Sequence, residues 1–167
     1  MQEDQSNIQL KMGSFSGPSE FAQQIRDALE AAAKQGWSEM VWSDANFADW
    51  PLRERSVVES LQQWSQAGRK LVMLAWQYED LRRLQPRFVT WRVTWDHIVD
   101  CRICRHIDPS DFPSALWGPR WFCHRREVQR SVGISGDGAV AMQRLREVLG
   151  ELHRSSRPGF PATTLGL

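Results

Sequence analysis

The sequence predicts a single α/β domain in three layers, with helices flanking a mixed β-sheet. Apolar residues recur at helical spacing in some segments, and short apolar runs typical of strands lie between them. The two patterns alternate in the first half of the chain, which is typical of parallel strands joined by right-handed crossovers. Closely spaced strands follow in the second half. We therefore expect the first half of the sheet to be parallel and the second half antiparallel.

The first predicted elements are a short strand and a long helix. Residues 8–12 alternate apolar and polar side chains before Gly13, which predicts a half-buried edge strand. From Pro18 onwards, apolar residues at spacings of three and four predict a helix that ends at Gly36. Residues 40–42 then form a short apolar strand.

The next elements complete the parallel half. A loop from Asp44 to Trp50 leads to Pro51 and into a helix that Gly68 ends. Residues 71–76 form a continuous apolar run, which is typical of a central strand buried on both faces. A short helix and a second helix that begins at Pro86 follow this strand.

The chain changes character after residue 98. Alternation predicts a strand over 99–104, and two more strands are expected at 120–124 and 128–134, with a turn at 125–126. A last helix is expected over 141–152. Its predicted inner stripe is Ala141, Leu145, Val148 and Leu152.

Composition predicts the boundaries of the domain and the cellular location of the protein. We expect residues 8–154 to form the domain, residues 1–7 a flexible N-terminus, and residues 155–167 a flexible tail rich in Ser, Pro, Gly and Thr. The acidic, polar start lacks a secretory pattern, and no run approaches the ~18 apolar residues of a membrane helix. The three cysteines are odd in number and lack the spacing of a disulfide framework, which argues against a secreted protein held together by disulfides. These features predict a cytoplasmic location.

The net charge is +1, but the charged residues are unevenly distributed along the chain. Residues 1–68 carry 5 Lys and Arg against 10 Asp and Glu, whereas residues 69–130 carry 12 against 7. Two interpretations stay open: the two halves pair their charges within a folded domain, or the second half presents an arginine-rich, anion-binding face. The candidate anion-binding residues are Arg120, Arg125 and Arg126.

A group of His and Cys residues raises the question of a zinc site. Its candidate ligands are Cys101, Cys104, His106 and Cys123. Residues three apart in a strand point to opposite faces, so Cys101 and Cys104 meet only if the strand is broken. The alternative is that the cysteines are small buried strand residues, as free cysteines usually are. We expect no cofactor, with zinc as the alternative.

Aromatic and basic residues are interleaved over residues 87–95. Such residues stack on bases and neutralise phosphates when both types share a face. On a helix, Phe88, Trp91 and Trp95 share one face, and Arg87 lies about 100° away from Phe88. This geometry favours core packing and leaves nucleic-acid binding as an alternative.

The elements around the segment from Trp117 to Arg126 resemble those of a known family. Crossover helices, a three-stranded run and a closing helix resemble one half of a phospholipase D-like domain over most of residues 38–155. Active members of that family carry a His-x-Lys-x4-Asp motif on the strand that would correspond to Trp117–His124. Here the motif positions hold Trp117, Pro119 and His124. The resemblance therefore implies a degenerate copy without the covalent phosphohistidine chemistry of the family.

A second resemblance concerns the first half of the chain. The strand at 40–42, the helix that ends at Gly68 and the strand at 71–76 are similar to STAS-type regulatory domains, which bind partner proteins. Those domains typically carry a Ser or Thr near the start of the helix for phosphorylation. Asp49, Trp50, Pro51 and Leu52 stand there instead. This resemblance implies a protein-interaction domain whose switch residue is absent or displaced.

Two classes of function remain, and no motif identifies a ligand. In the first, the chain is a non-catalytic cytoplasmic binding or accessory domain that contacts a protein partner or a second copy through exposed Trp, the Asp44–Trp50 loop and the tail. In the second, it acts on phosphodiesters or binds phosphate or nucleic acid through residues 97–126. His97 and His124 are then the candidate catalytic residues, and His106 a further base or ligand. We expect the first class.

Overall fold

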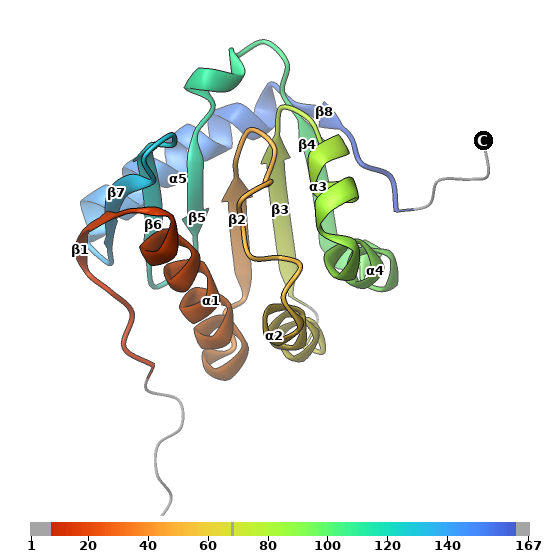
Figure 1. The fold of residues 1–167 in the computed structure, drawn as a ribbon, viewed down its shortest axis with the longest axis horizontal. Coiled ribbons are helices and arrows are strands. Elements are labelled where there is room, and N and C mark those ends of the chain that lie inside the picture. The colour runs from red at the N-terminus through yellow and green to blue at the C-terminus, as the bar shows by residue number, and fades with distance from the viewer. Residues whose placement is uncertain (1–7, 68, 163–167) are drawn as a thin grey trace, which may run out of the picture.

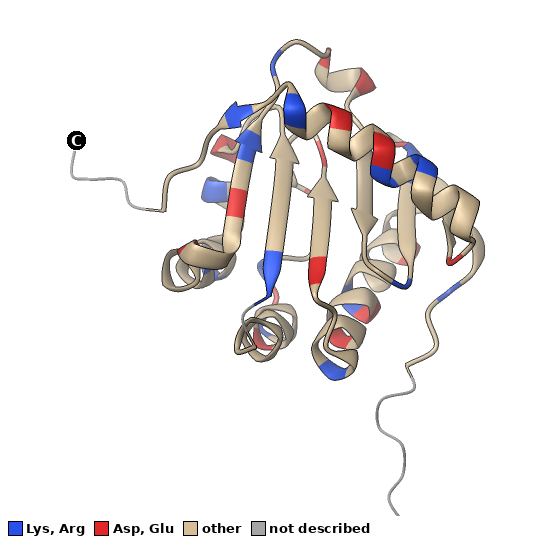
Figure 2. Ribbon diagram, turned by 180° about the vertical axis from the view of Figure 1, so that it is seen from behind, with Lys and Arg blue, Asp and Glu red and all other residues tan. Residues whose placement is uncertain are grey.

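The structure is a computed structural model that describes residues 8–67 and 69–162. These residues build one eight-stranded mixed sheet with the strand order β1-β7-β6-β5-β2-β3-β4-β8. Helices α1 to α4 cover one face of the sheet, and α5 alone crosses the other face (Figures 1 and 2). The three-layer α/β fold predicted from the sequence is confirmed. The segments 1–7 and 163–167, predicted to be flexible, lie outside the described residues.

The parallel part of the sheet follows the predicted crossovers. Its strands are β2 (Glu39–Ser43), β3 (Lys70–Ala75) and β4 (Val99–Ile103). The helices that connect them are α2 (Arg55–Ser65), α3 (Glu79–Leu84) and α4 (Pro86–Thr94). Strand β4 was expected in the antiparallel half, but it pairs parallel to β3 because α3, α4 and a short turn η1 (Asp96–Ile98) carry the chain back across the sheet.

The antiparallel strands lie at both sides of this parallel centre. They are β1 (Gly13–Ser16), β5 (Ser114–Trp117), β6 (Phe122–Glu127), β7 (Val132–Gly136) and β8 (Arg157–Pro158). A short turn η2 (Pro109–Asp111) precedes β5. Strand β5 pairs with β2 and so joins the two halves into one sheet.

Helix α1 (Pro18–Gln35) agrees with its prediction, and Gly36 ends it in the left-handed conformation with φ of 65°. Helix α2 begins later than Pro51 suggested, at Arg55, because residues 51–53 form turns. The proposed terminator Gly68 lies outside the described residues, and α2 ends at Ser65.

The edge strand was predicted at the wrong residues. Strand β1 is an edge strand as expected, but it begins at Gly13, where the predicted strand 8–12 was to end. Phe15 is the residue of β1 that enters the core, with 2% of its surface exposed. Ile8 and Leu10 pack against the same core without pairing to a strand. The alternation at 8–12 thus reflects packing and not sheet pairing.

The turn predicted at 125–126 was also wrong. Strand β6 continues through these residues to Glu127, and the turn to β7 follows it. Trp117–His124 is not one strand but the end of β5, a tight turn and the start of β6. Gly118 allows this turn to approach Trp37, whose ring would lie 2.5 Å from a β-carbon at that position. The positions compared with the phospholipase D motif therefore do not share a strand.

The final helix and the tail differ in detail from the prediction. Helix α5 (Ala139–Arg154) buries Leu145, Leu149 and Leu152. The predicted inner residues Ala141 and Val148 are exposed, because the buried stripe runs from Leu145 through Leu149. The predicted tail is part of the fold up to Phe160, since β8 pairs with β4 and Phe160 is buried.

Tryptophans form much of the core between the sheet and α1 to α4. All nine lie among the described residues, and six are buried while three are partly exposed. The buried ones are Trp37, Trp42, Trp50, Trp64, Trp91 and Trp121. The expectation of exposed tryptophans available to a partner is thus limited to the three partly exposed ones, Trp76, Trp95 and Trp117. None of the described helices has both the length and the apolar character that crossing a bilayer requires.

Candidate functional site

The four predicted zinc ligands do not come together. Cys101 on β4 and Cys123 on β6 are separated by three strands of the sheet. Cys104 lies on the opposite face from Cys101, and its thiol donates to the Leu152 carbonyl at 3.3 Å. His106 contacts Ser155 instead. In the described part of the chain, no three His, Cys, Asp or Glu residues are grouped to hold a metal ion.

The cysteines have the environment of core residues. Burial raises the pKa of the Cys101 thiol to about 11, although Arg92 beside it partly opposes this rise. Burial likewise raises the pKa of Cys123 to about 12. Thiols of this kind carry little thiolate near neutral pH, so neither is suited to metal binding or nucleophilic chemistry.

The three predicted anion-binding arginines do not form a site. Arg125 is buried and forms ion pairs with Asp44 and Asp49, so it is not available to an external anion. Arg120 and Arg126 are exposed, but they lie on either side of the Phe122–Arg125 stretch. Six residues of extended chain span roughly 20 Å, which is too far for the two to hold one phosphate.

The two candidate catalytic histidines are also apart. His97 lies in η1, exposed, with its ring 5.8 Å from that of Trp95. His124 lies on β6 between Ala115 and Ile134. Burial lowers the pKa of His124, and the positive charge of Arg126 lowers it further. Strand β6 and the η1 turn before β4 are on different sides of the sheet centre, so they cannot share a reaction centre.

The Asp44–Trp50 loop, predicted to contact a partner, is packed into the protein. Asp44, Phe47 and Trp50 are buried. The Asp44 carboxylate accepts hydrogen bonds from the Phe47 and Asn46 backbone amides, which fixes the loop. Gln85 adds bonds from its side-chain amide to the carbonyls of Phe47 and Trp50. Most of the loop is thus fixed and covered, and Asp49 is the residue in it that stays exposed.

Basic side chains do gather where β4 leaves the sheet. Residues 102–106 lie beside residues 153–158, because β8 pairs with β4 and Arg102 donates to the hydroxyl and carbonyl of Ser156 at 2.8 and 3.0 Å. His106 reaches Ser155 at 3.2 Å. These two segments contain four arginines, two histidines and no acidic residue. We call this set the basic edge: Arg102, Arg105, His106, His153, Arg154 and Arg157.

The basic edge also carries an aromatic group. The Arg105 guanidinium lies 4.4 Å from the centre of the Trp76 ring, and its Nε donates to the Trp76 carbonyl at 2.7 Å. Arg105 is exposed, and Trp76 is partly exposed. Trp76 follows β3 directly, so the stack stands at the carboxyl ends of the parallel strands, where α/β sheets usually bind ligands.

Part of the basic edge is neutralised and part is not. Arg154 pairs with Glu151 at 3.1 Å, Arg102 lies 3.9 Å from Asp100, and His153 contacts the same Asp100 carboxylate at 2.9 Å. Arg105 and Arg157 have no acidic partner among the described residues. Figure 2 shows basic residues on β8, at the end of β4 and at the end of α5. The edge therefore presents positive charge to solvent.

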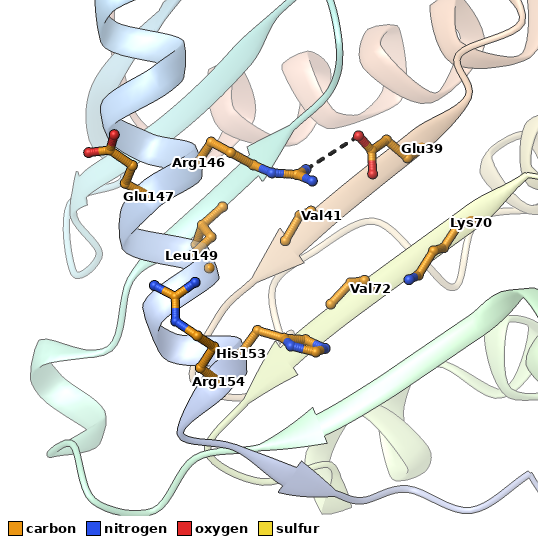
Figure 3. Close-up of a pocket in the computed structure, with 10 residues that line it drawn as sticks. Glu39, Val41, Lys70, Val72, Arg146, Glu147, Leu149, His153 and Arg154 are labelled. Carbon is orange, nitrogen blue, oxygen red and sulfur yellow. Dashed lines mark ion pairs between the residues drawn. The ribbon is translucent and has the colours of Figure 1, made fainter.

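A groove lies next to the basic edge, between α5 and the β2–β3 part of the sheet. Its volume is about 410 Å³. Val41 and Val72 form part of its lining from the sheet, and Leu149 faces them from α5 (Figure 3). Arg146 and Glu39 form an ion pair at one side, with Nη1 and Oε1 3.5 Å apart.

The sequence indicated only one part of the basic edge. Residues 102–106 fall within the 97–126 region named for phosphate or nucleic-acid binding and were also considered for zinc, whereas residues 153–157 were interpreted as a helix end and a tail. The signal that remains visible in hindsight is composition, since each segment is basic and free of acids. Only the pairing of β8 with β4 brings the two segments together.

Comparison with known proteins supports the fold. No protein-family model and no curated protein matches the sequence. Among solved structures, the chain is similar to TrmBL2, an archaeal chromatin protein whose structure shows a novel mode of DNA binding. The TM-score is 0.66 at 12% sequence identity, over 93% of this chain and 56% of that chain. This chain thus spans little more than half of that protein, and the likeness shows a shared fold.

Proposed function

We propose that the protein is a nucleic-acid-binding domain that contacts phosphates through the basic edge and has no hydrolytic centre. The observation that carries the proposal is the convergence of four arginines, without an acidic residue in either segment, at the carboxyl ends of the parallel strands. Arginine side chains neutralise phosphates, and the exposed Arg105 guanidinium, supported by the Trp76 ring below it, offers a flat cationic surface on which a base can stack.

The similarity to TrmBL2 supports this class of function over a protein-partner module. That protein is described as a chromatin protein that binds DNA, and its fold is shared over nearly all of this chain. Two of the features that favoured a protein partner are largely covered, since most of the Asp44–Trp50 loop is packed and six of the nine tryptophans are buried, while the end of the tail, 163–167, lies outside the described residues. A protein partner or a second copy of the chain stays the alternative.

The absence of hydrolysis is part of the proposal and rests on the site residues. If the phospholipase D-like resemblance is a relationship, Trp117 and Pro119 occupy the positions of the nucleophilic histidine and the lysine. His124, one of the two remaining candidates, is half-buried on β6, and His97 lies on the other side of the sheet centre, so neither has the other beside it as a catalytic partner. The domain would then hold nucleic acid without cleaving it.

Fluorescence anisotropy with labelled oligonucleotides tests the proposal. Single-stranded DNA, duplex DNA and RNA are titrated at about 50 mM and 200 mM salt, and binding should weaken steeply with salt. The double substitution Arg105→Ala and Arg157→Ala should weaken binding. It should also reduce the slope of log Kd against log salt by about one for each phosphate that an arginine no longer neutralises.

The matched control changes two exposed arginines outside the basic edge. Arg55 lies on α2, and Arg130 lies in the turn before β7. Replacing both by Ala removes the same charge, so an equal loss of binding would show that only net charge matters. No binding at about 50 mM salt would refute the proposal. Cleavage of the oligonucleotide that disappears in His124→Ala would refute its non-hydrolytic part.

A further inference from the structure

The groove beside α5 exists because one helix is too narrow to cover its face of the sheet. Figure 2 shows α5 crossing near the carboxyl ends of β2, β3 and β4, while their amino-terminal halves stay uncovered. The other face is crossed by the four helices α1 to α4 (Figure 1). The resulting groove, of about 410 Å³, falls within the usual ~300–1,000 Å³ of small-molecule sites.

The sheet side of the groove is apolar. Val41 and Val72 are register partners on neighbouring parallel strands, so their side chains lie next to each other on the same face. Leu149 faces them from α5, as Figure 3 shows. Val41 and Leu149 are already covered, with 7% and 1% of their surface exposed, so the partly buried Val72 is the residue of the three that still presents apolar surface to the groove. Apolar surface of this kind gains free energy when a ligand removes it from water.

One cation in the groove lacks a partner. Glu39 and Lys70 are register partners at the open end, but the Glu39 carboxylate is turned to Arg146, which also lies 4.5 Å over the Trp117 ring. Lys70 is exposed and forms no ion pair with any described residue. In Figure 3 its ammonium group points along the sheet toward Val72 and His153. The groove thus combines an apolar surface with an unpaired ammonium group.

We propose that this groove binds a small amphipathic carboxylate, with its carboxylate on Lys70 and its apolar body on Val41, Val72 and Leu149. The lining also contains Glu39 and Glu147, which would repel a polyanion. The groove is therefore a different site from the basic edge, although His153 and Arg154 belong to both. A single negative charge on an apolar body matches the one unpaired cation.

Titration with octanoate, monitored by two-dimensional amide NMR, tests the site. Octanoate should shift the amide signals of Val41 and Val72 and bind at least about tenfold more tightly than 1-octanol, which has the same chain without the charge. Lys70→Gln should abolish this difference by weakening octanoate alone. Inorganic phosphate, which lacks the apolar body, should not compete with octanoate at equal concentration.

The control is Lys34→Gln on α1, on the opposite face of the sheet, where Lys34 pairs with Glu30. This variant should bind octanoate like the unmodified protein. Equal binding of octanoate and octanol, unchanged binding in Lys70→Gln, or competition by phosphate would each overturn the proposal. The Arg105→Ala and Arg157→Ala variant should keep octanoate binding, so the outcome is independent of the proposed nucleic-acid function.

Discussion

Arg125 is held inside the protein by two carboxylates and an aromatic ring. Its guanidinium lies 3.0 Å from Asp44, 2.5 Å from Asp49 and 4.0 Å from the centre of the Phe21 ring. Burial acts against the charged form, but the hydrogen bond to Asp49 and the charge of Asp44 outweigh it, and the pKa of Arg125 is raised. The residue therefore stays charged and ties β6 to the loop after β2.

Replacing Arg125 by Met should destabilise the fold strongly. Asp44 has only 4% of its side chain exposed, so the substitution leaves a buried carboxylate without its partner. Breaking a buried pair in this way costs about 3–5 kcal/mol. Urea unfolding measures the loss, and Arg126→Met, a substitution at the exposed neighbour, should change stability by less than about 0.5 kcal/mol.

A double variant separates charge from packing at this position. Adding Asp44→Asn to Arg125→Met removes the unpaired charge, while the Asn oxygen can still accept the amides of Phe47 and Asn46. Part of the lost stability should return. If the double variant is as unstable as the sum of both single changes, the carboxylate was not the cause.

At the scale of elements, β8 and the residues after it pack along β4 at the edge of the sheet. We call this segment, residues 157–160, the C-terminal clasp. The Phe160 ring stacks on Tyr78 with centroids 5.0 Å apart, and the guanidinium groups of Arg82 and Arg92 lie 5.4 and 5.5 Å from its centre. The Phe160 carbonyl accepts a hydrogen bond from Arg92 at 2.9 Å. This clasp also positions Arg157 within the basic edge.

Phe160→Ala should therefore weaken the packing of the clasp on the sheet edge. Phe160 is 5% exposed, and truncating a buried Phe costs about 3–5 kcal/mol. Because Arg157 depends on the clasp, nucleic-acid affinity should fall together with stability in urea unfolding and anisotropy. Phe160→Leu, which keeps most of the volume, should lose much less of both. Unchanged stability in Phe160→Ala would mean that this segment does not contribute to the fold in solution.

The elements that the sequence predicted well are those whose pattern is local. Helix α1 and strand β3 carry their own periodicity or apolar run, and both were placed within one or two residues. Strand β8 was missed because two exposed residues have no pattern, and only pairing with β4 defines them. The second segment of the basic edge, residues 153–157, was missed for the same reason, since it lies about fifty residues from the first in sequence. Arg125 was misassigned because its partners are distant in sequence.

At the scale of the whole molecule, buried titratable groups limit stability at both ends of the pH range. The pKa of His124 is lowered by burial from 6.5, so below that pH the unfolded chain takes up a proton that the folded protein resists. Stability therefore falls as the solution becomes acidic. Burial raises the pKa of Cys123 from 9.0 to about 12, so the unfolded thiol ionises first and stability falls again as pH rises above 9.

The free energy of unfolding should thus be greatest between these limits, near pH 7 to 8 on the cited values. His124→Gln should remove the fall that begins below pH 6.5, while the carboxylate of Glu54, whose pKa is lowered by its hydrogen bond to Arg26, still lowers stability at more acidic pH. Cys123→Ala should reduce the alkaline fall but not remove it, because burial also raises the pKa values of Cys101, Cys104 and Tyr78. Urea unfolding across this pH range measures the loss of stability on the acid side and on the alkaline side. If stability falls equally steeply on the acid side in His124→Gln, then His124 titrates normally in the folded protein. His124 would then again be a candidate for an accessible base.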